Sequence, residues 1–168
     1  MPAGSTYSTI ATTTLGSNQS IVTFSSIPGT YTDLVLITNA ATTVANKDVY
    51  MHFNSDSGSN YSRTVLYGNG SSAASDRAAN VSFGWIDYLG WTGTTLGTQV
   101  CVVNIMNYSN STTNKTFLSR ANNAASAVDA NVGMWRNTAA INRIDIGATT
   151  SGIFITGSTF TLYGIAAA

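Results

Sequence analysis

The chain has 168 residues, enough for one domain with its own apolar core, so neither a disulfide nor a metal is needed for folding. Only 8% of the residues are charged, seven Lys and Arg balance seven Asp, and Glu is absent. A chain with zero formal net charge lacks the electrostatic attraction that binds nucleic acid or anionic membranes, so we expect neither as a partner.

Short runs of β-branched and aromatic residues, divided by Gly, Asn, Ser and Pro, follow one another along the whole chain. The run from Asp33 to Ile37 is apolar on both faces, which favours a central position in a sheet. No segment of about ten residues shows the 3.6-residue period of a helix. In chain order, the predicted strands are Tyr7–Leu15, Ser20–Phe24, Thr32–Thr38, Val49–Phe53, Tyr61–Tyr67, Gln99–Tyr108, Lys115–Arg120, Asn131–Arg136, Ile141–Ile146 and Thr159–Ile165.

Turn signals between these runs recur about every 8–12 residues, a spacing typical of sandwiches and barrels. We therefore predict an all-β fold, an antiparallel jelly-roll-like β-sandwich of about eight to ten strands. No linker or shift in composition divides the chain, so we expect an N-terminal arm over residues 1–8 and a single β-sandwich domain over residues 9–168. The first residues have neither the basic nor the apolar region of a signal peptide, and export is not expected.

Few groups are suited to catalysis. The single histidine, His52, lies in the middle of a predicted strand and no nucleophile-elbow motif accompanies it, so we interpret it as structural. Asp87, Asp129 and Asp145 are candidates for the paired carboxylates of a glycosidase, but nothing in their spacing pairs them. The sequence therefore predicts no catalytic residue and a protein that is not an enzyme.

No metal or cofactor site is expected either. Residues 54–60 place oxygen-bearing side chains at alternate positions, as calcium loops do, but the glycine is misplaced for an EF-hand and Val65 occupies the position of the closing acid. We interpret this loop as a turn between strands. Cys101, the only cysteine, is expected to be a small buried apolar residue.

Aromatic side chains leave one binding function open, because their rings can stack on sugars. The competing interpretation is that they are core residues or subunit contacts. The candidates are Trp85, Trp91, Trp135, Tyr50, Tyr61, Tyr67 and Tyr88.

Four segments also carry a family resemblance, and they span nearly the whole chain: residues 25–36 (SSIPGTYTDLVL), 53–62 (FNSDSGSNYS), 135–141 (WRNTAAI) and 160–165 (FTLYGI). In this order they resemble a group of tailed-phage virion proteins that is common in phages of cyanobacteria and other aquatic bacteria. The resemblance implies a virion structural protein. Some proteins of this kind are capsid cement (decoration) proteins, small β-sandwiches that sit as trimers on the outer shell, and others are tail or fibre components.

We therefore expect a capsid cement protein that binds the outside of the major capsid protein shell as a homotrimer, stabilises it, and is assembled in the host cytoplasm. The arm over residues 1–8 and the loops at one end are expected to contact the shell. The alternative is a tail-fibre or host-recognition module that binds cell-surface glycan. A carbohydrate-active enzyme is the weakest interpretation because the carboxylate pair is missing.

Overall fold

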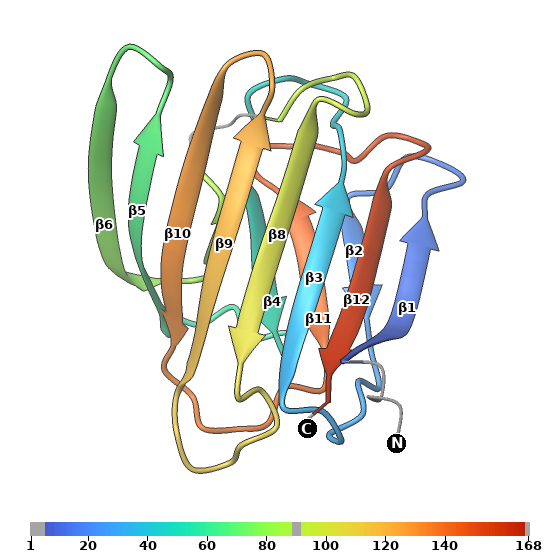
Figure 1. Cartoon of the computed structure of the whole chain (residues 1–168), viewed down its shortest axis with the longest axis vertical. Coiled ribbons are helices and arrows are strands. Elements are labelled where there is room, and N and C mark those ends of the chain that lie inside the picture. The colour runs from blue at the N-terminus through green and yellow to red at the C-terminus, as the bar shows by residue number, and fades with distance from the viewer. Residues whose placement is uncertain (1–5, 89–91, 167–168) are drawn as a thin grey trace.

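The computed structural model describes residues 6–88 and 92–166, and within them every regular element is a β-strand. Neighbouring strands are antiparallel, and they form two sheets packed face to face (Figure 1). The predicted all-β sandwich is confirmed, whereas a jelly-roll strand order stays a prediction. The strands are β1 (Tyr7–Thr14), β2 (Ile21–Phe24), β3 (Asp33–Asn39), β4 (Val49–Phe53), β5 (Tyr61–Gly68), β6 (Ala73–Val81), β7 (Gly84–Asp87), β8 (Gln99–Met106), β9 (Lys115–Asn123), β10 (Ala127–Trp135), β11 (Ile144–Ala148) and β12 (Thr159–Ile165).

The larger sheet has eight strands in the order β1-β12-β3-β8-β9-β10-β5-β6, and the smaller sheet has four in the order β2-β11-β4-β7. In Figure 1 the larger sheet lies in front, and β2, β4 and β11 lie behind it. β7 packs against β5, β9 and β10 of the larger sheet. Each sheet therefore has an inner face that packs on the core and an outer face. In the described part of the chain, no third layer of strands or helices covers either outer face.

The alternation of side chains along each strand places one row in the space between the sheets. In β4 this row is Val49, Met51 and Phe53, and all three are buried. Phe117 of β9 and Trp135 of β10 enter from the larger sheet, and their ring centroids lie 5.9 and 5.6 Å from that of Phe53. One continuous core thus joins both sheets.

β3 lies between β12 and β8, inside the larger sheet, as its apolar sequence predicts. Leu34 and Leu36 belong to the core and are fully buried. Val35 and Ile37 belong to the opposite row, and Ile37 is exposed. The second apolar row of β3 therefore lies on the outer face of the sheet.

The twelve strands exceed the predicted eight to ten because stretches with weak strand propensity are nevertheless paired. β6 occupies residues that the sequence predicts mostly as a loop, and residues 121–127, predicted as a loop with one helical turn, belong mainly to the β9–β10 hairpin. Ala, Asn and Asp are poor strand formers. The ladder to β5 nevertheless satisfies the backbone of β6, whatever its side chains are.

The N-terminal arm is predicted over residues 1–8, but the last two of these residues belong to a strand. β1 begins at Tyr7, and Tyr7 and Ser8 pair with Ile165 and Gly164 of β12. These two residues extend the sheet because their backbone groups find partners on β12. Residues 1–5 lie outside the described residues.

Candidate functional site

The outer face of the larger sheet carries adjacent aliphatic side chains that are open to solvent. Val128 and Val132 lie on the outer row of β10, and Leu66 of β5 stands opposite Ala130 between them. The exposed fractions of Val128, Val132 and Leu66 are 58%, 56% and 63%. Single exposed aliphatic residues are ordinary, but adjacent ones mark an interaction surface. We use the term apolar face for the outer-row residues Leu66, Val100, Val102, Met106, Val128 and Val132.

A groove of about 790 Å³ lies in the apolar face, between the β5–β6 hairpin and strands β8 to β10. Leu66, Val100 and Val128 line it together with small alanines and Arg120. At the edge formed by β6, the groove is lined by small residues such as Ala73 and Ala74. The groove is therefore shaped for aliphatic side chains of another surface.

The charges on this part of the outer face are of one sign. Arg77 stands opposite Thr64, and Arg120 stands opposite Val102 and Ala130, so both arginines belong to the outer row. Neither forms an ion pair with any residue that the structure describes. In β5, β6, β8, β9 and β10 the carboxylates belong to the inner row, where Asp76, for example, binds Arg63 at 2.9 Å.

Two of the aspartates that the sequence leaves unpaired are in fact neighbours. Asp87 of β7 is fully buried and Asp129 of β10 is 5% exposed, and the two carboxyl groups influence each other's pKa. Their sequence spacing contains no signal for this approach, because β7 and β10 are distant in sequence and pack together across the sandwich. Gln99 Nε2 donates to Asp87 Oδ2, and Tyr88 N donates to Asp129 Oδ2 at 2.7 Å.

Burial determines the protonation of this acid pair. Desolvation, together with the charge of Asp129, raises the pKa of Asp87 well above its ordinary range. Burial likewise raises the pKa of Asp129 to about 7, although hydrogen bonds from Tyr88 and Ala121 oppose the shift. Glycosidase carboxyls must both reach a substrate, and in retaining enzymes they stand about 5 Å apart across it. Two buried carboxyls whose ionisation is opposed by burial fit a structural pair rather than a catalytic one.

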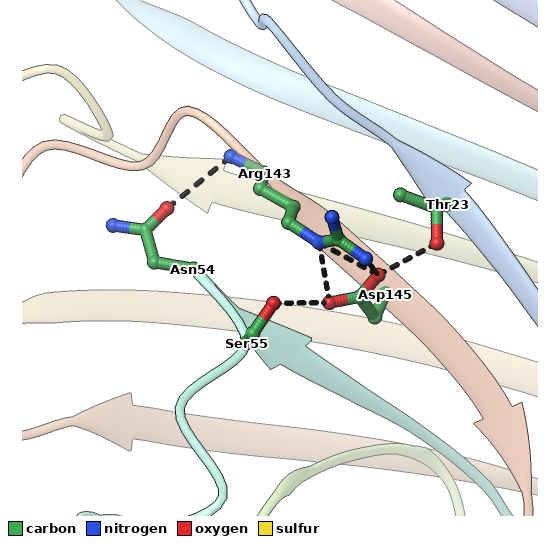
Figure 2. Close-up of polar contacts among 5 residues, drawn as sticks. All are labelled: Thr23, Asn54, Ser55, Arg143 and Asp145. Atoms are coloured by element: carbon green, nitrogen blue, oxygen red, sulfur yellow. Dashed lines mark hydrogen bonds and ion pairs between the residues drawn. The ribbon is translucent and has the colours of Figure 1, made fainter.

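Asp145, the third candidate acid, stands opposite Thr23 and His52 and so belongs to the outer face of the smaller sheet. Figure 2 shows its polar contacts. Arg143 donates to it through Nε and Nη2, at distances between 2.7 and 3.0 Å. Thr23 Oγ1 and Ser55 Oγ donate at 2.6 and 3.1 Å. Burial opposes ionisation of Asp145, but these hydrogen bonds outweigh it and lower the pKa. The arrangement holds a carboxylate and a guanidinium in one fixed geometry.

The loop over residues 54–60 is organised around one carboxylate and its N–H donors. Asp56 accepts hydrogen bonds from Gly58 N at 2.8 Å, Asn60 Nδ2 at 2.9 Å and Trp135 Nε1 at 2.7 Å. A calcium ligand would direct these oxygens at a cation, whereas here they face N–H groups. The interpretation as a turn is supported, and the described residues contain no group of three or more His, Cys, Asp or Glu side chains placed to hold a metal.

The aromatic candidates divide between the core and the surface. Tyr61, Trp85 and Trp135 are buried, whereas Tyr50, Tyr67 and Tyr88 are partly exposed, and Trp91 lies outside the described residues. His52 stands beside Tyr50 on β4, with ring centroids 5.1 Å apart, and burial lowers its pKa.

Cys101 is buried, as predicted, and its thiol donates to the carbonyl oxygen of Ile86 at 3.1 Å. The apolar face itself is not predicted by the sequence reasoning, although one signal points to it. β8 alternates Val100, Val102 and Met106 with the equally apolar Cys101, Val103 and Ile105. A strand with two apolar rows needs cover on both faces, and the sandwich covers only one.

Comparison with known proteins does not assign a family. No protein-family model matches the chain, and the search of curated proteins found no significant match. No helix in the described part of the chain has the length and apolarity needed to cross a membrane.

Proposed function

We propose that this chain is a virion structural protein of a tailed phage, a capsid cement protein that docks through its apolar face onto the major capsid protein shell. The observation that carries the proposal is the row of exposed Leu66, Val128 and Val132 on a chain with very few charges. Burying apolar surface contributes roughly 25 cal/mol per Å², without any need for charged partners. The resemblance of four sequence segments to phage virion proteins supports the same conclusion.

A homotrimer strengthens such docking. Each copy needs to bury only about 1,000 Å² against the shell, close to the lower limit of a specific interface. Three linked contacts then hold together through their high effective concentration, even though each is weak. In this proposal the apolar face contacts the shell, whereas the sequence predicts that contact for the arm over residues 1–8 and the loops at one end.

The test uses capsids of the encoding phage that lack this protein, mixed with purified chain and sedimented. Val128→Asp places a charge in the centre of the apolar face, and we expect it to weaken binding at least about tenfold. Val44→Asp is the matched control, because Val44 is 51% exposed but lies in the loop between β3 and β4 and not in the apolar face, and it should bind normally. Equal binding of both variants, each shown to be folded by thermal unfolding, would contradict the proposal.

The number of copies per virion distinguishes the cement protein from the tail-fibre alternative. A cement protein is present in hundreds of copies per particle, whereas a tail component is present in a few dozen or fewer. Quantitative mass spectrometry of purified virions, with the major capsid protein as internal standard, measures this number directly.

A further inference from the structure

The outer face of the smaller sheet has a mainly apolar centre, which we call the platform: Ile21, Tyr50, His52 and Phe83. Gly147 of β11 stands opposite Ile21 of β2 on one side and Tyr50 of β4 on the other. A Cβ at Gly147 would lie 2.5 Å from Tyr50 Oη and 2.8 Å from Ile21 Cδ1. Both side chains therefore close over the glycine and form one surface.

Three rings make up most of the platform. The centroid of Tyr50 lies 5.0 Å from that of Phe83, with an angle of 34° between the ring planes, and 5.1 Å from that of His52. All three rings are partly exposed. Burial lowers the pKa of His52, so its imidazole is neutral at pH 7 and the platform carries no charge of its own.

Hydrogen-bonding groups without partners border these rings. Asp145 stands opposite His52 in the ladder and holds Arg143 through Nε and Nη2 (Figure 2). Arg143 Nη1 has no hydrogen-bond partner among the described residues, and the side chain is 43% exposed. The Tyr50 hydroxyl also forms no hydrogen bond with the part of the chain that the structure describes. The guanidinium is thus fixed in place with one N–H₂ group available.

We propose that this platform binds a neutral hexopyranose unit of a glycan. One face of a pyranose ring is apolar and packs on aromatic rings, while its hydroxyls need donors and acceptors at the edge. Tyr50 and Phe83 provide the rings, and the Tyr50 hydroxyl and Arg143 Nη1 provide the edge. The charge of Arg143 is balanced by Asp145, so a sugar carboxylate gains no net attraction, and a neutral sugar is favoured. The platform lies on the opposite side of the sandwich from the apolar face, and this proposal does not depend on docking to a capsid.

The experiment uses the purified chain, without virions. ¹H–¹⁵N NMR spectra are recorded during titration with methyl α-glucopyranoside, methyl α-mannopyranoside and methyl β-galactopyranoside, and separately with N-acetylneuraminic acid. We expect millimolar binding of at least one neutral sugar, with shifts centred on the amides of Gly147, Tyr50 and Phe83. Absence of binding, shifts centred elsewhere, or preference for the acidic sugar would each overturn the proposal.

Two variants test the roles of the ring and of the hydroxyl. Tyr50→Phe keeps the ring and should weaken binding about two- to tenfold, the effect of one hydrogen bond. Tyr50→Ala removes the ring and should weaken it more than about tenfold. Tyr163→Ala changes a tyrosine on the outer row of the larger sheet and should leave binding unchanged. Equal affinity of Tyr50→Phe and Tyr163→Ala would exclude the hydroxyl contact, and unchanged affinity of a folded Tyr50→Ala would overturn the platform.

Discussion

Asp87 and Asp129 form a buried pair whose ionisation opposes folding. Three buried acceptor oxygens around this pair have no donor among the described residues: Asp87 Oδ1, Gln99 Oε1 and Asn131 Oδ1. A proton shared between the two carboxyls reduces this deficit, because a protonated acid becomes a donor. Their pKa values are raised by burial in the folded state, so the folded chain binds more protons than the unfolded chain near neutral pH. Stability must then fall as pH rises through this range.

We expect the free energy of unfolding to decrease by about 1 kcal/mol or more between pH 6.5 and 8.5, since the pKa of Asp129 is about 7 in the folded state and 3.8 ordinarily. The window begins at pH 6.5 because the lowered pKa of His52 acts in the opposite direction, most steeply below that value. Asp87→Asn supplies a permanent N–H donor and should flatten the dependence. Urea unfolding at each pH measures it.

Asp145→Asn is the control for this experiment. The pKa of Asp145 is lowered, so its ionised form contributes stability above the ordinary pKa and loses it only as pH falls below about 4. The variant should therefore be less stable than the parent by the same amount at every pH from 6.5 to 8.5. A pH slope in Asp87→Asn as steep as that of the parent would contradict the shared-proton account.

At the level of elements, glycines let a strand from each sheet approach the same ring. Phe117 of β9 lies between Gly133 of β10 and Gly84 of β7, and a Cβ at Gly84 would lie 2.7 Å from its Cζ. A Cβ at Gly133 would overlap the ring outright. Because β7 belongs to the smaller sheet and β10 to the larger, this ring fixes the distance between the sheets.

Gly133→Ala should destabilise the protein by about 1–3 kcal/mol, the usual effect of an overpacked core. Phe117→Leu in the same chain makes room for the added methyl group and should restore part of the loss. Gly16→Ala is the matched control, because its Cβ would meet no atom of the described residues within 4 Å, and it should be nearly neutral. Denaturant unfolding of the four chains measures the effect, and equal stability of Gly133→Ala and Gly16→Ala would contradict it.

Strand identity could be predicted from the sequence where composition and alternation agree. Val49–Phe53 and Thr159–Ile165 are predicted with the bounds that the structure shows. β6 could not be predicted, because its pairing depends on β5 rather than on its own side chains. Two features depend on which strands become neighbours: Asp87 lies near Asp129, and Phe117 packs against Gly133. A single sequence contains no signal for such neighbours.

For the whole molecule, composition predicts a sandwich with few charges but does not show which face is open. The sequence of β8 shows two apolar rows of side chains. Only the position of the smaller sheet determines that the row with Val100 and Val102 faces outward. The two outer faces differ in chemistry: one is aliphatic with Arg77 and Arg120, and the other has aromatic rings beside the Arg143–Asp145 pair. A protein with two unlike faces can dock with one and still present the other.

Docking through the apolar face should resist salt. Raising the ionic strength from about 0.1 M to 1 M shortens the screening length from about 10 Å to about 3 Å, which weakens charge contacts but not apolar burial. The formal net charge is zero, so the chain as a whole has no long-range attraction to lose. We therefore expect the amount of chain that sediments with capsids to change less than about twofold across this range, and Arg120→Gln to behave like the parent. Release of the chain at 1 M salt would show instead that Arg77 and Arg120 hold acidic groups of the shell, and the energetic centre of the interface would then be the arginines rather than Leu66 and Val128.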